Sequence, residues 1–281
     1  MTKNSKLVLT ALAPLAVLAL VCRIWQLVTC IDFETGFFAE DSGFWGLSLY
    51  ILLGMTAVIV ALLCFADKKL GSDAFRKNAP ELSSKQTAAL GAAFLVWGCA
   101  ICYDIVNEFS GKIGVSDLVS ALMCLTVIAI AFILLSSRTV RPLSGYIMLV
   151  PAVGYTVKAA ALFISDTVVV RESEKLLALL SYLAAVLFFL SLGRFLSNNE
   201  TKLSRVKLVF FSSAAFLLNV AGVFSSLSAK LVGPSPINEQ IPTPSVSELG
   251  TCIVAAAVLI CLYARIRKPD TEAEASAEKS L

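Results

Sequence analysis

The sequence predicts an all-α integral membrane protein with about eight transmembrane helices. Of the 281 residues, 58% are hydrophobic and only 15% are charged, and the mean hydropathy is +0.83. This is more apolar surface than one soluble core of this length could bury. The apolar residues also fall in runs long enough for a helix to cross a bilayer. Finally, lysine and arginine are unevenly distributed among the segments between these runs.

Runs of about 17 to 25 mostly apolar residues occur eight times along the chain. They cover residues 7–29, 45–66, 87–105, 118–136, 143–165, 176–196, 208–231 and 249–266. The longest basic segment, "DKKLGSDAFRKNAPELSSK", separates the second run from the third. The segment "GPSPINEQIPTPSVS" separates the seventh run from the eighth, and its prolines exclude a continuous helix. The eight runs are therefore predicted to be eight separate spans.

The basic residues predict how these spans are oriented. Only six of the 23 lysines and arginines fall on the side of the membrane opposite the N-terminus, and these are Arg23, Lys112, Lys158, Arg171, Lys175 and Lys230. Segments rich in lysine and arginine stay in the cytosol. We therefore expect both termini to be cytosolic and the protein to lie in the plasma membrane. The polar tail, residues 269–281, is expected to be disordered.

Two short sequences suggest an internal repeat. "FSGKIGVSDL" follows the third run and "LSAKLVG" follows the seventh, and both contain small residues, a lysine, an aliphatic residue and a glycine. This predicts two tandem four-helix halves, residues 1–142 and 143–268. Because each half has an even number of spans, the halves would be related by a pseudo-two-fold axis along the membrane normal.

The first and fifth runs each contain a proline followed by a base. Pro14 precedes Arg23 by nine residues, and Pro151 precedes Lys158 by seven. Both bases lie roughly 9 Å inside the outer end of their run, as the helical rise predicts. In one interpretation they are interface anchors whose long side chains reach the headgroups. The difference in spacing points the two bases in different directions.

A second interpretation places the two bases in a polar vestibule. Asp104, Glu108 and Lys112 are spaced four residues apart and form one stripe at the outer end of the third run. Ionisable groups inside a span are costly unless they are paired or lie in a water-filled cavity. Arg23 and Lys158 could thus face Asp104 and Glu108, although Glu108 and Lys112 could equally pair with each other.

Other polar or reactive residues give weaker signals. Asn219 falls near the middle of the seventh run, where an amide can bind a solute or hold two helices together. Cys99 and Cys102 form a CxxC sequence within a predicted span, where cysteines usually act as small apolar side chains. No metal site is predicted from them.

Function is predicted only in outline. The chain has no histidine, which excludes histidine-based acid/base catalysis and Ser/His/Asp or Cys/His nucleophiles. We expect a permease or transporter component for a small anionic or zwitterionic solute, because polar groups near prolines in two repeats favour a solute site. The alternative is a non-transporting membrane assembly partner or sensor subunit without catalytic activity. A membrane enzyme using Asp104 and Glu108 is a third, weaker hypothesis.

The candidate solute-binding residues are accordingly Arg23, Asp104, Glu108, Lys158 and Asn219. The expected partners are the lipid bilayer, a small anionic solute and another membrane protein. No cofactor, metal or nucleic acid is expected.

Overall fold

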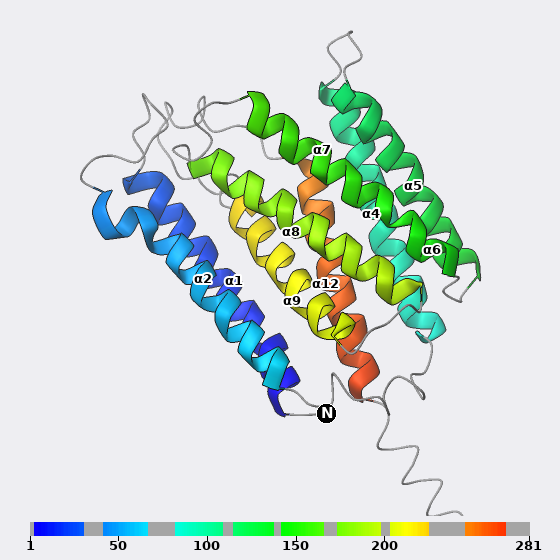
Figure 1. Cartoon of the computed structure of the whole chain (residues 1–281), viewed down its shortest axis with the longest axis horizontal. Coiled ribbons are helices and arrows are strands. Elements are labelled where there is room, and N and C mark those ends of the chain that lie inside the picture. Colours follow the sequence, from blue (N-terminus) through cyan, green and yellow to red (C-terminus); the bar gives the residue numbers. More distant parts are fainter. Residues whose placement is uncertain are drawn as a thin grey trace, which may run out of the picture.

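The computed structural model describes the chain as a bundle of helices (Figure 1). The described residues are 3–30, 42–66, 82–108, 115–137, 142–165, 173–197, 203–224 and 245–267. The repeated segments around Lys112 and Lys230 and the tail at 269–281 lie outside these ranges.

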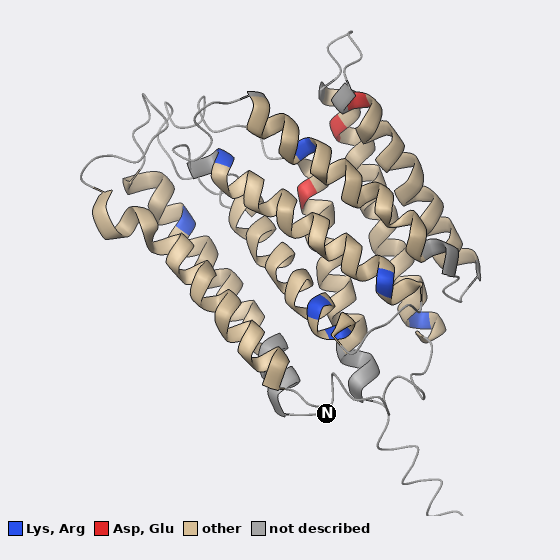
Figure 2. Cartoon of the chain, viewed as in Figure 1, with Lys and Arg blue, Asp and Glu red and all other residues tan. Residues whose placement is uncertain are grey.

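Seven helical segments in the described ranges are long and apolar enough to cross a membrane. This confirms the prediction of an α-helical, multi-pass membrane protein. They are formed by α1 (Lys3–Thr29), α2 (Gly43–Ala66), α4 (Ser84–Glu108), α5 (Val115–Ser137), α6 (Pro142–Ile147) with α7 (Leu149–Ser165), α8 (Ser173–Leu196), and α9 (Ser204–Asn219) with the π-helical segment η2 (Val220–Phe224). Among the described residues, lysine, arginine, aspartate and glutamate lie toward the helix ends rather than in the middle of the bundle (Figure 2).

The eighth predicted span corresponds to α12 (Val246–Arg267), whose apolar part, Val246–Leu262, is shorter than the others. This helix lies at the centre of the bundle and packs against α4 and α9. The start of α1 and the end of α12 lie at the same end of the bundle (Figure 1).

The fifth span is broken near its proline. Helix α6 ends at Ile147, and α7 begins at Leu149. Pro151 explains the break, because proline has no N–H to donate to the carbonyl of Ile147 and its ring clashes with that carbonyl. Pro14, by contrast, lies inside the continuous helix α1.

Helices α6 and α8 cross at two glycines. A Cβ atom added to Gly145 would lie 2.5 Å from both the carbonyl oxygen of Gly193 and the backbone nitrogen of Ser197. Backbone atoms cannot move aside as a flexible side chain can. The two helices can therefore approach this closely only because residue 145 has no side chain.

We expect Gly145→Ala to lower the free energy of unfolding by about 1–3 kcal/mol, because the added methyl group forces α6 and α8 apart. Thermal unfolding of the detergent-solubilised protein measures the change. Gly54→Ala is the matched control, since a Cβ there meets nothing within 4 Å. The close crossing would be contradicted by equal melting temperatures for the two variants.

The helices share one continuous core. Helices α4, α5, α7, α8, α9 and α12 pack against one another, and the α1–α2 hairpin packs on α9 and η2 and adds Leu12, Ala16, Val60 and Cys64 to the same core. An aromatic stack lies within the core, where Trp97, Tyr155 and Phe189 are parallel, with ring centroids 4.8 to 6.4 Å apart. These rings join α4, α7 and α8, the helices that position the polar groups described next.

Candidate functional site

Asp104 caps the N-terminus of α12. Its Oδ1 accepts a hydrogen bond from the backbone N–H of Val246 at 3.0 Å, and its Oδ2 accepts one from the N–H of Ser247 at 2.7 Å. The hydroxyl of Ser245 also donates to Oδ2, at 2.5 Å. The first N–H groups of a helix have no partner within the helix and carry partial positive charge. The Asp104 carboxylate of α4 thus accepts hydrogen bonds from N–H groups at the start of α12 that have no partner within that helix.

Glycine allows α12 to lie close enough to α4 for this contact. A Cβ atom added to Gly250 would lie 2.4 Å from Cδ1 and 2.9 Å from Cα of Trp97. Trp97 is fully buried and lies two helical turns before Asp104 on α4. The Asp104 cap and the contact between Gly250 and Trp97 therefore both hold α12 against α4.

A line of hydrogen bonds continues from this cap into the core. The hydroxyl of Thr251 donates to the carbonyl of Ser247 at 3.1 Å and lies 2.5 Å from the hydroxyl of Tyr155. Because the single proton of Thr251 is used, Tyr155 is the donor in the second bond. Nζ of Lys158 lies 6.0 Å from the centroid of the Tyr155 ring. Asp104 and Lys158, two of the predicted site residues, therefore both lie near the buried Tyr155.

Arg23 is fully buried between helices rather than exposed to lipid. Its Nη1 donates to Oε1 of Gln26, which is also fully buried. Nε2 of Gln26 in turn donates to the carbonyl oxygen of Gly46 at 2.5 Å. Arg23 and Gln26 therefore connect α1 to the first turn of α2. This burial does not fit the interface-anchor interpretation of Arg23, and its contacts with Gln26 lie within the α1–α2 hairpin.

Asn219 is buried and donates from Nδ2 to the carbonyl of Ala215, one turn earlier in α9, at 2.7 Å. The π-helical segment η2 begins at the next residue and packs against α1, α8 and α12. Such segments are often single turns at functional sites. Here the amide of Asn219 donates within its own helix, at the point where the hydrogen-bond pattern changes.

The side chain of Glu108, another predicted site residue, lies outside the described residues.

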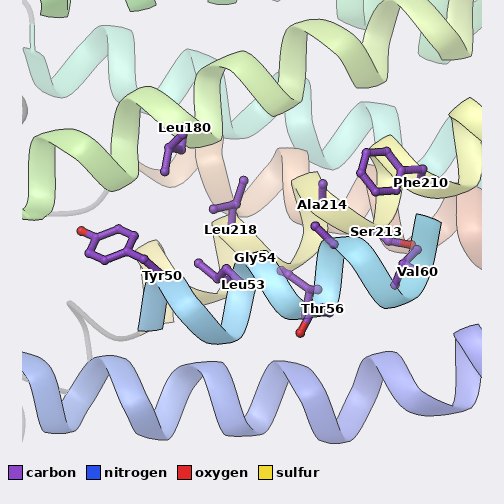
Figure 3. Close-up of a pocket in the computed structure, with 12 residues that line it drawn as sticks. Tyr50, Leu53, Gly54, Thr56, Val60, Leu180, Phe210, Ser213, Ala214 and Leu218 are labelled. Carbon is purple, nitrogen blue, oxygen red and sulfur yellow. The ribbon is translucent and has the colours of Figure 1, made fainter. Parts of the chain in front are cut away.

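An apolar groove that the sequence analysis missed lies between three helices (Figure 3). Its floor is α9, its walls are α2 and α8, and its volume is about 280 Å³. We call it the α2–α9 groove. Its lining residues are Tyr50, Leu53, Gly54, Thr56, Ala57, Val60, Leu180, Phe210, Ser213, Ala214, Leu217 and Leu218.

None of the lining residues of the α2–α9 groove is charged. The hydroxyl of Thr56 donates to the carbonyl of Leu52 at 2.8 Å, and that of Ser213 donates to the carbonyl of Val209 at 2.7 Å. Both acceptors lie one turn earlier in the same helix. Apart from the hydroxyl of Tyr50 at one end, the groove therefore presents mainly hydrocarbon to an occupant.

Two cysteines of neighbouring helices lie close together. Among the described residues, no three His, Cys, Asp or Glu side chains are placed to hold a metal ion. Sγ of Cys102 instead lies 2.9 Å from Sγ of Cys124 on the neighbouring helix α5. The pair that the structure brings together is thus not the CxxC pair of Cys99 and Cys102.

Comparison of the chain with protein-family models, with curated proteins and with solved structures finds no match. The geometry of the described residues is therefore the basis for the function proposed below.

Proposed function

We propose that this is a non-transporting membrane protein that binds a lipid acyl chain in the α2–α9 groove. The proposal rests on the α2–α9 groove itself. Its lining is uncharged, and the hydroxyls of Thr56 and Ser213 donate to carbonyls of their own helices. The proposal favours the second of the two predicted function classes, an assembly partner or sensor, over solute transport.

The dimensions of the groove support an acyl chain as the occupant. It extends along α2 from Tyr50 to Val60, which is about 15 Å at 1.5 Å per residue. Its lining is uncharged, and its volume is about 280 Å³. Both properties suit an extended hydrocarbon chain better than a helix of another protein, which is about 10 Å across.

The position of the groove supports the same occupant. Both walls belong to membrane-spanning helices, and the labelled side chains of α2 and α8 lie on opposite sides of α9 (Figure 3). Gly54 is exposed, and nothing lies within 4 Å of where its Cβ would be. A lipid chain could therefore enter sideways from the bilayer, without crossing a polar surface.

Filling the groove should remove the lipid. We expect native mass spectrometry of the purified full chain to show a phospholipid adduct, and Gly54→Phe to raise the Kd for phospholipid about tenfold, a change of about 1.4 kcal/mol. The added ring would occupy the space of the chain. Val58→Phe is the matched control, because Val58 is 59% exposed and does not line the groove. Equal lipid retention by both variants would refute this binding site.

Transport of a small anionic or zwitterionic solute is the second candidate. Lys158 near Tyr155 and the positive N-terminal end of α12 favour it, although Asp104 already occupies that helix end. Vesicles containing the protein distinguish the two functions. Acyl-chain binding alone predicts no uptake of labelled phosphate or glycine above that of empty vesicles. Uptake that Lys158→Gln abolishes would favour the permease.

We further infer that both termini are cytosolic and that the protein lies in the plasma membrane, on the strength of the basic-residue distribution. A reporter fused to the C-terminus should report cytosol. The tandem repeat stays a prediction. Helix α2 packs against α1, as its counterpart α8 packs against α7.

A further inference from the structure

We propose that Cys102 of α4 and Cys124 of α5 form a disulfide bond that fastens these two helices together. Both are free thiols in the structure, and their sulfur atoms lie 2.9 Å apart. Cys124 is buried between the helices, and Cys102 is exposed at the edge of the same contact. The inference is independent of the lipid-binding proposal.

The register of the two helices places these cysteines opposite each other. Along α4, the contact residues are Gly91, Gly98 and Cys102, which are seven and then four residues apart. Their partners on α5 are Leu135, Ile128 and Cys124, which run back along the chain in the same steps of seven and four. Steps of four and seven keep residues on one face of a helix. The cysteine pair therefore belongs to a regular antiparallel contact rather than to a chance approach of two side chains.

Glycine brings the helix backbones close enough for the bond. A Cβ at Gly98 would lie 2.7 Å from Cγ1 of Ile128, and one at Gly91 would lie 2.9 Å from Cγ of Leu135. Sγ of Cys124 also lies 3.5 Å from the carbonyl oxygen of Gly98, one turn from Cys102. Disulfides need Cα atoms within about 7 Å, a separation that helices reach where glycine removes the intervening side chain.

The neighbouring Cys99 is a poorer partner for Cys102. Residues three apart on a helix have Cβ atoms about 5–6 Å apart, whereas a disulfide requires about 3.5–4.5 Å. The CxxC sequence therefore cannot close within the intact helix. Cys124 is the partner that the fold provides.

The bond forms by exchange with a disulfide donor, either a low-molecular-weight disulfide or a thiol–disulfide oxidoreductase. The thiolate of one cysteine attacks the donor disulfide and releases one donor thiol. The thiolate of the other cysteine then attacks the resulting mixed disulfide and releases the second donor thiol. Cys102 and Cys124 lose their two protons and two electrons, and the donor disulfide is reduced to two thiols. Cys102 lies six residues before the end of α4, on the outer side in the proposed topology, where disulfides persist.

Peptide mapping of the full chain in lipid vesicles tests the bond. The protein is incubated with oxidised glutathione, free thiols are blocked with N-ethylmaleimide, and the digest is analysed without reduction. We expect one linked peptide pair containing Cys102 and Cys124, lighter by two hydrogen masses than the two thiol peptides together. Reduction should release it and lower the melting temperature by several degrees, since the bond closes a loop of the chain.

Three variants separate this bond from other cysteine chemistry. Cys124→Ser should abolish the linked pair, whereas Cys99→Ser and Cys252→Ser, the second a buried cysteine of α12, should leave it unchanged. Blocking of both Cys102 and Cys124 by N-ethylmaleimide after oxidation would overturn the proposal. So would a linked pair that contains Cys99 in place of either cysteine. Each outcome is read from the peptides themselves and does not depend on the lipid content of the α2–α9 groove.

Discussion

Asp104→Ala is expected to lower the free energy of unfolding by roughly 3 kcal/mol. The carboxylate accepts hydrogen bonds from two backbone N–H groups and one hydroxyl at the start of α12. Hydrogen bonds to charged groups contribute about 1.5–3 kcal/mol each, and they do not simply add. Without Asp104, the first turn of α12 loses its cap. Thermal unfolding in detergent measures the loss.

Asp104→Asn should have a smaller effect, because the amide oxygen still accepts a hydrogen bond while the attraction of a negative charge to the helix end is lost. Asn107→Ala is the matched control, since Asn107 is exposed on the same helix. If Asp104→Ala and Asn107→Ala unfold at the same temperature, Asp104 does not hold α12 in place.

Arg23→Leu is expected to lower the free energy of unfolding by about 2 kcal/mol. The guanidinium is fully buried and donates to Gln26, so its removal strands the side-chain oxygen of Gln26 inside the protein. Arg23→Lys should recover only part of the loss, because an ammonium group does not reproduce the geometry of a guanidinium. Thermal aggregation in native membranes ranks the stability of the wild type, Arg23→Lys and Arg23→Leu.

Double-mutant cycles identify the partner of Arg23. The change in Arg23→Leu, Gln26→Leu should be smaller than the sum of the single changes by about 1–2 kcal/mol, because removing both partners leaves no stranded acceptor. The cycle with Asp104→Leu serves as the control and should be additive, since the hydrogen bonds of Asp104 go to α12. Strong coupling of Arg23 to Asp104 would instead support the predicted vestibule.

The sequence predicted the class of fold because the constraint of the bilayer is local. Each span must be a run of apolar residues of fixed minimum length, and such runs are visible without knowing which helices touch. The break between α6 and α7 follows from Pro151 and its missing N–H, a local cause as well. However, Pro14 lies inside α1 without such a break, so proline alone did not decide where a helix ends.

The partners of the candidate site residues could not be predicted in the same way. Asp104 is correctly placed near the end of a span, but the helix that it caps begins 142 residues later. Which helix ends meet depends on the packing of the whole bundle. The sequence suggested a base as its partner, because charge pairing is the commonest way to retain an acid in a membrane. Backbone N–H groups provide the same stabilisation without any charged residue to recognise.

The α2–α9 groove was missed for a related reason. It results from the separation of α2 from α8 over the surface of α9, and its lining residues are ordinary apolar and small side chains. Gly54 and Ala57, three residues apart on α2, are the only local signal, and small residues at this spacing usually indicate close helix packing. A space between helices has no characteristic residue pattern by which the sequence could predict it.

An experimental structure of the full chain in lipid nanodiscs tests acyl-chain binding most directly. The account predicts one continuous tube of density, the width of a single hydrocarbon chain, running along α9 between α2 and α8 from Tyr50 to Val60. The same density should be missing in Gly54→Phe. A wild-type structure in which α2 closes against α8, with no space between them, would contradict the proposed function.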